Sequence, residues 1–237
     1  MKKEQLIFLP GGDRQFAHLK SEVKIGNSDV LIIGSNAEML GQLFFVEGAK
    51  SVSIIVDNHD SLVQSRYLLQ NNKNISLKMM EFTKTDFKDS SFDLIYTQAS
   101  VSSMLRNKII REIKRILKPN GYLNVGEIVC LKENPPMFVK DIWEAGDIDP
   151  LNSLELNDYY GKRNFEVVNV KDLSTQLKEY YNVGRNLLET KTGELSDKEK
   201  SFYKKLLKRV SHESNVYLKL GGDRFMGFTS IILRKTS

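Results

Sequence analysis

The chain has little of several residue types on which common protein classes depend. Its single cysteine, Cys130, excludes an internal disulfide framework. The three histidines (His18, His59 and His212) lie far apart, so no cluster of metal ligands is visible and no metal is expected. No apolar run approaches the roughly 18 to 20 residues that a membrane span requires. The start of the chain has too few apolar residues for a signal peptide, which indicates a cytoplasmic protein.

A large surplus of one charge is also missing. Lysine and arginine number 35 against 30 aspartates and glutamates, a difference of +5. The most basic stretch, residues 198–209, contains Glu199 and is typical of the solvent-exposed face of a helix. The charge therefore gives little support for a nucleic-acid partner.

Short apolar runs alternate with amphipathic stretches over most of the chain. Strands are predicted at 30–34, 51–57, 75–82, 92–97 and 122–129. Residues 108–117 carry five apolar side chains on one helical face, and the segment Lys118-Pro119-Asn120-Gly121 is predicted to end that helix. Strands separated by helices of this length indicate βαβ units. The expected fold class is α/β, with a doubly wound, mainly parallel sheet covered on both faces.

The second half is less regular. A short helix is predicted at 154–160, a strand at 165–170 with Asp172 or Ser174 to cap the next helix, and a last strand at 225–235. These elements suggest three parts. They are an N-terminal lid segment (1–28), a core (29–182 and 225–237), and a helical cap (183–224) that is expected to cover the binding site.

Three strand ends carry residues suited to ligand binding. Ligands of doubly wound folds bind beyond the carboxyl ends of the strands. Gly34 allows a tight turn after the first strand. Asp57 follows the second strand and can accept hydrogen bonds from both hydroxyls of a ribose. Glu81 and Phe82 follow the third and can hold an amine beside a stacking surface. Each also has a structural alternative: Gly34 as a turn, Asp57 with Asn58 as a helix cap, and Glu81 as a solvated side chain.

These residues resemble the motifs of the class I S-adenosylmethionine-dependent methyltransferases, and within them the small-molecule group that includes the ubiquinone/menaquinone methyltransferases. The segment VLIIGSNAE (30–38) looks like the first motif of the family, and Asp57 and Glu81 match its ribose-side and adenine-side acids. The stretch KIIREIKRILKPNGYLNV (108–125) is similar to the family's segment around strand five.

The resemblance implies a seven-stranded sheet, S-adenosylmethionine as cofactor and S-adenosylhomocysteine as product. It places the cofactor at Gly34, Ser35, Asn36, Glu38, Asp57, Asn58, Glu81, Phe82, Thr97 and Gln98. Trp143, Tyr159 and Tyr160 are candidates to line the pocket of a small-molecule acceptor. No catalytic base is assigned, because an acceptor that is already nucleophilic needs none.

The chain departs from the family pattern in strand one, in the turn after it, and after strand four, where Ser102-Ser103 stand at a His-rich position of the family. Ile32 stands where the family has an acid in strand one, and Asn36 and Glu38 replace two turn glycines. The family's acid helps to hold the methionine end of the cofactor. Glu38 or Glu127 is the candidate to supply that charge here.

Other chemistries fit less well. A nicotinamide cofactor calls for G-x-G-x-x-G, of which Gly34 alone is present, and Glu38 would repel its phosphates. The segment Asn134-Pro135-Pro136-Met137 follows the fifth strand and ends in methionine, so it is interpreted as a turn rather than an adenine-methyltransferase motif. One cysteine excludes arsenite methylation, and no carboxylate cluster suits catechol-type methyl transfer. The principal hypothesis is methyl transfer to a small molecule. The alternatives are a binding or regulatory protein on this fold and a nucleic-acid methyltransferase.

Overall fold

The computed structural model describes residues 7–69, 72, 74–194 and 211–236. Its strands are β1 (Asp29–Ile33), β2 (Ser51–Val56), β3 (Ile75–Met79), β4 (Phe92–Gln98), β5 (Leu117–Cys130), β6 (Leu151–Asn152), β7 (Phe165–Asp172) and β8 (Met226–Lys235). Its helices are α1 (Gly12–Glu22), α2 (Glu38–Val46), α3 (His59–Leu69), α4 (Arg106–Ile116), α5 (Met137–Ala145), α6 (Leu156–Gly161) and α7 (Ser174–Glu194), with a 3-10 turn η1 (Gly222–Arg224). Residues 211–219 are also helical.

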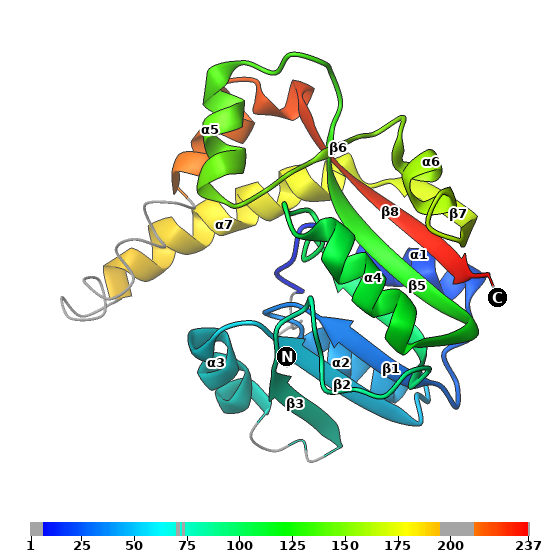
Figure 1. The fold of residues 1–237 in the computed structure, drawn as a ribbon. Coiled ribbons are helices and arrows are strands. Elements are labelled where there is room, and N and C mark those ends of the chain that lie inside the picture. Colours follow the sequence, from blue (N-terminus) through cyan, green and yellow to red (C-terminus); the bar gives the residue numbers. More distant parts are fainter. Residues whose placement is uncertain (1–6, 70–71, 73, 195–210, 237) are drawn as a thin grey trace.

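The strands form one twisted sheet in the order β3-β2-β1-β4-β5-β8-β7, with β6 pairing to the end of β5 (Figure 1). Strands β3, β2, β1, β4 and β5 are parallel, whereas β8 runs antiparallel to both β5 and β7. This arrangement confirms the predicted fold class: a doubly wound, mainly parallel sheet with a helical segment inserted before the last strand.

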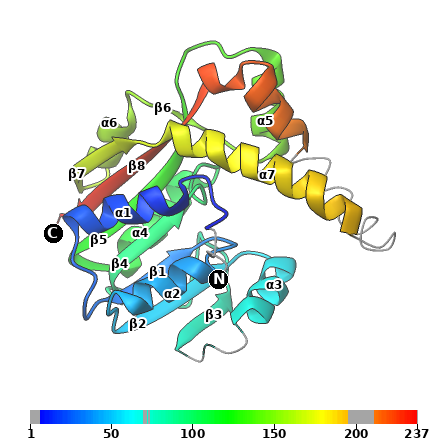
Figure 2. The same cartoon turned by 180° about the vertical axis from the view of Figure 1, so that it is seen from behind.

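Alternating side chains of the central strands build a core on each face of the sheet. In β1, Val30 and Ile32 pack with apolar residues of α1, α2 and α3 on one face. Leu31 and Ile33 pack with residues of α4 and α6 on the other. The two views show these helix layers on opposite sides of the strands (Figures 1 and 2). Because both faces are covered, the central strands appear in the sequence as continuous apolar runs.

The helix predicted after the strand at 165–170 continues into the range assigned to the cap (183–224). Helix α7 begins at Ser174, where Asp172 Oδ1 accepts hydrogen bonds from the backbone N–H and the hydroxyl of Ser174 (2.8 and 2.6 Å). Leu177 and Tyr217 pack in a third apolar cluster with α5. Residues 195–210 of the predicted cap lie outside the described residues, and the role of a cap over the acceptor stays a prediction. Within the described ranges, no helix is long and apolar enough to cross a membrane.

The predicted boundaries of two strands were wrong. Strand β3 ends at Met79 rather than at residue 82, so Glu81 and Phe82 belong to the following loop. Strand β5 begins at Leu117, and residues 118–121, predicted as a turn, are part of it. A bulge in the pairing of β4 with β5 accommodates these residues.

Candidate active site

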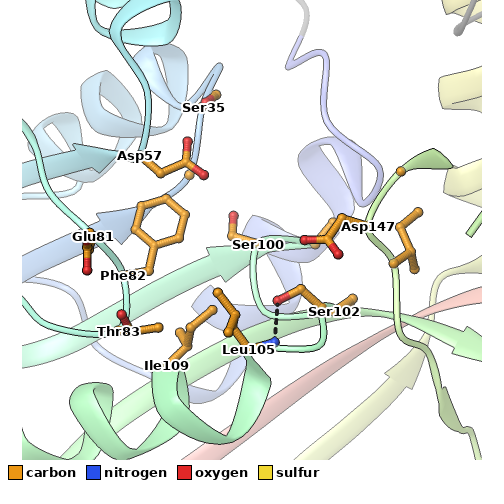
Figure 3. A pocket seen from close by; sticks show the side chains of 15 residues that line it. Ser35, Asp57, Glu81, Phe82, Thr83, Ser100, Ser102, Leu105, Ile109 and Asp147 are labelled. Carbon is orange, nitrogen blue, oxygen red and sulfur yellow. Dashed lines mark hydrogen bonds between the residues drawn. The ribbon is translucent and has the colours of Figure 1, made fainter. Parts of the chain in front are cut away.

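A cavity of about 580 Å³ opens at the carboxyl ends of the parallel strands. Strand β1 pairs with β2 on one side and β4 on the other, so the strand order reverses here, where doubly wound sheets bind ligands. The volume suits a ligand of cofactor size. The cavity is lined by Gly34, Ser35, Asp57, Glu81, Phe82, Thr83, Ala99, Ser100, Ser102, Ser103, Leu105, Ile109, Gly146, Asp147 and Ile148 (Figure 3).

The turn after β1 requires glycine at position 34. Gly34 has a φ of +127°, and a Cβ atom there would lie 2.1 Å from the Ser100 hydroxyl oxygen. That hydroxyl donates to the carbonyl of Ile33 at 2.8 Å, which links the turn to the loop after β4. The close approach of these two loops forms one wall of the cavity.

Asp57 and Asn58 divide the two roles that the sequence left open. Asn58 caps α3, since its Oδ1 accepts from the backbone N–H of Ser61 at 2.8 Å. Its Nδ2 donates to Asp57 Oδ1 at 2.8 Å. Asp57 is thus oriented by the capping residue, and its carboxylate faces the cavity (Figure 3). The geometry leaves this carboxylate available for a ligand's hydroxyl groups.

The loop after β3 supplies the far side of the same wall. Glu81 is exposed, and the half-buried Phe82 ring lies between Asp57 and Ile109 of α4 (Figure 3). Phe82 also packs against the apolar cluster beneath it. An apolar ring beside an acid suits a planar group that carries hydrogen-bond donors.

A second, smaller cavity adjoins the first and shares Gly34, Ser35 and Ser100 with it. Its volume is about 10 Å³, room for roughly one water molecule, and Ile32 and Leu9 are among its lining residues. Gln98 also lines it. The Gln98 amide nitrogen donates to the carbonyl of Gly12 (3.3 Å) and to the Tyr96 hydroxyl (3.1 Å), while its buried Oε1 has no partner among the described residues. An unsatisfied buried acceptor of this kind fits a ligand that donates a hydrogen bond.

Five of the ten predicted cofactor residues do not line the large cavity: Asn58, which caps α3, Gln98, which lines the small cavity, and Asn36, Glu38 and Thr97. Asn36 is exposed, with φ +60°, and accepts a hydrogen bond from Gln64 at 3.2 Å. Glu38 is buried and accepts from the Ser65 hydroxyl of α3. Thr97 is fully buried within β4. Glu38 therefore faces α3 and not the cavity, because its side chain lies on the face of α2 that packs against α3.

Glu127, the other candidate for the missing charge, is fully buried beneath the cavity. It forms an ion pair with Arg106 (Nε to Oε1, 3.2 Å) and accepts from the Ser102 and Tyr160 hydroxyls at 2.5 and 2.6 Å. Arg106 also bonds Asp149. Burial, and then the adjacent Glu127, raise the pKa of Tyr160 well above its usual range. Glu127 is thus committed to a structural cluster.

The structure places the three aromatic candidates for acceptor binding outside the cavity lining. Trp143 is buried in the cluster of α5 and α7, with its Nε1 donating to Met226 Sδ at 3.1 Å. Tyr160 is fully buried, and its hydroxyl donates a hydrogen bond to Glu127. Tyr159 is half-buried, packs its ring under Arg163 at 3.6 Å and donates to Asn107 at 2.9 Å. All three side chains are engaged in packing and hydrogen bonds within the protein, and none of them lines the cavity.

Several lining residues were missed by the sequence analysis. Those at 99–103 follow β4, so the rule that ligands bind beyond strand ends would have found them. Gly146, Asp147 and Ile148 follow α5, well after strand β5, and no local signal connects them with the first motif. Asp57, Glu81 and Asp147 make the lining acidic, since it contains no lysine, arginine or histidine.

Comparisons with known proteins agree with this geometry. The sequence profile of a family described as methyltransferase domain matches residues 33–125, less than half of the chain but including the loops after β1, β2, β3 and β4. Residues 33–125 thus belong to an S-adenosylmethionine-dependent methyltransferase domain. The cofactor of this class is S-adenosylmethionine, with S-adenosylhomocysteine as its product form. No curated protein matches the chain by sequence.

Solved structures share the fold of this methyltransferase domain at low sequence identity. A proposed sarcosine dimethylglycine methyltransferase from Galdieria sulphuraria is 14% identical, with a TM-score of 0.72 over 94% of this chain and 84% of that one. A Haemonchus contortus phosphoethanolamine N-methyltransferase, in complex with S-adenosylhomocysteine, is 13% identical, with a TM-score of 0.76 over 95% of this chain and 53% of that one. The cyclase SpnF is 18% identical, with a TM-score of 0.74 over 94% of this chain and 80% of that one. A cyclase among these structures is a reminder that fold alone does not specify the reaction.

Proposed function

We propose that the protein transfers the methyl group of S-adenosylmethionine to a small-molecule acceptor bound in the cavity of about 580 Å³. The observation that carries this proposal is the meeting of Gly34, Asp57 and Glu81 in one acidic cavity at the point where the strand order reverses. Carboxylates favour a cationic sulfonium ligand and disfavour the phosphates of a dinucleotide. The names of two similar structures, which refer to sarcosine and phosphoethanolamine, support a small acceptor.

The residues present fit the cofactor by their chemistry. Gly34 allows the turn after β1 to approach Ser100 closely, where a Cβ atom would clash with the hydroxyl group. Asp57 is suited to the ribose hydroxyls and Glu81 with Phe82 to the adenine. We assign the amino-acid end of the cofactor to the neighbourhood of Gln98. The buried Oε1 atom of Gln98 can accept a hydrogen bond from the ammonium group, a role that the family gives to an acid at the position of Ile32. The cofactor supplies an activated methyl group, and the protein's own part is to hold donor and acceptor in line and exclude water.

The resemblance to ubiquinone/menaquinone methyltransferases does not specify the acceptor. Its best-matching stretch, residues 108–125, forms parts of α4 and β5, and of these residues Ile109 alone lines the cavity. A nucleic-acid acceptor is the weaker alternative, because the cavity lining carries no basic side chain to meet phosphates.

Titration calorimetry with S-adenosylmethionine, S-adenosylhomocysteine and NADH tests the donor site. We expect micromolar binding of the two sulfur ligands and none of NADH. Asp57→Asn should weaken both sulfur ligands by about 10- to 100-fold, the loss of hydrogen bonds to a charged group. Asp60→Asn, which removes the same charge from the first turn of α3, is the control and should bind as the wild type does. If neither sulfur ligand binds, the proposal is wrong.

A second candidate function is cofactor binding without methyl transfer. The observation that favours it is the small size of the cavity beside Ile32, about 10 Å³, at the place where the family holds the methionine end with an acid. This candidate predicts S-adenosylhomocysteine binding without turnover on any acceptor. The two candidates separate when a panel of small acceptors is screened for release of S-adenosylhomocysteine.

A further inference from the structure

We infer that the acceptor is an amine that binds as a cation and that Asp147 is the residue that selects it. This inference rests on the proposed function, since it concerns the acceptor side of the same cavity. Asp147 reaches the cavity from the loop after α5, opposite Asp57, and its carboxylate points toward Ser100 (Figure 3). It forms no side-chain hydrogen bond or ion pair with any residue in the described ranges.

The position of Asp147 is unfavourable for the fold itself. It follows Gly146, the C-cap of α5, and adopts a φ of +52°, a region in which glycine or asparagine costs less. A carboxylate at a helix C-terminus also faces the negative end of the helix dipole, which destabilises the folded state. No contact in the described structure offsets these costs, whereas a bound cation would.

The surroundings that the structure describes favour a cationic acceptor over an anionic one. The cation beneath this end of the cavity, Arg106, is buried and already paired with Glu127 and Asp149. Leu105 and Ile148 contribute apolar walls. A carboxylate beside apolar walls, with no uncompensated cation in the lining, suits an alkyl- or arylammonium group.

The chemistry of the transfer is consistent with such an acceptor. The bound ammonium first releases one proton to solvent, which frees the nitrogen lone pair. The nitrogen then forms a bond to the methyl carbon as the bond from that carbon to sulfur breaks, and the electron pair stays on sulfur. The products are a methylammonium group and a neutral thioether. Asp147 lies on the exposed side of the cavity, where the departing proton meets water.

Three probes of nearly equal shape test the inference: benzylamine, benzyl alcohol and benzoate. Each is titrated into protein saturated with S-adenosylhomocysteine. Benzylammonium should bind at least about 10-fold more tightly than the alcohol, and benzoate should be the weakest. Asp147→Asn should reduce the preference for the amine to less than about 3-fold, leave S-adenosylhomocysteine affinity unchanged, and raise the melting temperature.

The control is Glu144→Gln, which removes one negative charge from the same end of α5 at a residue outside the cavity lining. It should leave the preference among the probes unchanged. Equal affinity for amine and alcohol in the wild type would overturn the inference, as would binding of no probe at about 20 mM, because even a weak carboxylate–ammonium site would register there.

Two further outcomes are distinguishable. If Asp147→Asn weakens S-adenosylmethionine but not S-adenosylhomocysteine, Asp147 serves the sulfonium of the donor, and the inference about the acceptor is wrong. If the wild type does not bind S-adenosylhomocysteine at all, the proposed function fails, independently of Asp147.

Discussion

Arg106 and Arg234 each hold a glutamate, but in opposite surroundings. The Arg106 side chain is 4% exposed and its partner Glu127 is fully buried, whereas Arg234 and Glu166 are 44% and 50% exposed. Water screens the second pair, so its geometry contributes little to stability. The first pair has no such screening, and removal of one partner leaves an uncompensated charge inside the protein.

We therefore expect Arg106→Met to lower the free energy of unfolding by about 3 kcal/mol. The double variant Arg106→Met/Glu127→Met should recover much of that loss, since it leaves no unpaired charge. Arg234→Met is the matched control and should not shift the urea midpoint measurably. A loss in Arg106→Met no greater than in Arg234→Met would contradict the assignment of Glu127 to a structural cluster.

At the scale of elements, a chain of polar contacts attaches α1 to the sheet. Gln15 Nε2 donates to the Thr97 carbonyl and to Asn124 Oδ1, both at 2.8 Å. His18 Nδ1 lies 2.8 Å from the Ser230 hydroxyl, and its Nε2 lies 3.2 Å from Asn169 Oδ1. These hydrogen bonds connect α1 to strands β4, β5, β7 and β8. They also hold in place the N-terminal segment, whose Leu9 lines the small cavity.

His18 makes this attachment sensitive to pH. Burial lowers the pKa of His18 below its ordinary value of 6.5, and the positive charge of Lys171 acts in the same direction, against the hydrogen bond with Asn169 and the charge of Glu22. Between the folded-state pKa and 6.5 the unfolded chain binds more protons, so stability falls as the pH falls below about 6.5.

Thermal unfolding between pH 7.5 and 5.5 measures this effect. His18→Gln, which keeps a donor and an acceptor but does not titrate, should lose less stability over this range than the wild type. His212→Gln, at an exposed position, should behave as the wild type does. Equal pH dependence in all three proteins would show that His18 does not carry the effect.

At the scale of the whole molecule, the site brings together loops that are far apart in the sequence. If the cavity binds S-adenosylhomocysteine, hydrogen exchange should slow in residues 34–36, 57–59, 81–83, 97–103 and 146–148. Residues 25–28 and 118–121, at the amino ends of strands β1 and β5, should exchange at the same rate with and without the ligand. Protection at these amino ends, or none at the loops, would place the ligand elsewhere.

The pattern of elements could be predicted because it is local. Buried parallel strands leave continuous apolar runs, helices leave a stripe of period 3.6, and a glycine after the first strand marks the turn. Gly34, Asp57 and Glu81 could be found for the same reason, since each lies one or two residues beyond the end of a strand. The sequence by itself thus determined the fold class and the part of the cavity on the side of β1, β2 and β3.

Tertiary structure alone decided which polar and aromatic side chains face the cavity. Glu38 and Glu127 look equivalent in the sequence, yet one faces α3 and the other an internal arginine. Tyr160 resembles a lining residue and is a buried hydrogen-bond donor. Asp147 lines the cavity although it follows α5, far along the chain from the first motif. Such choices depend on helix rotation and on contacts between distant segments, and neither leaves a periodic signal in the chain.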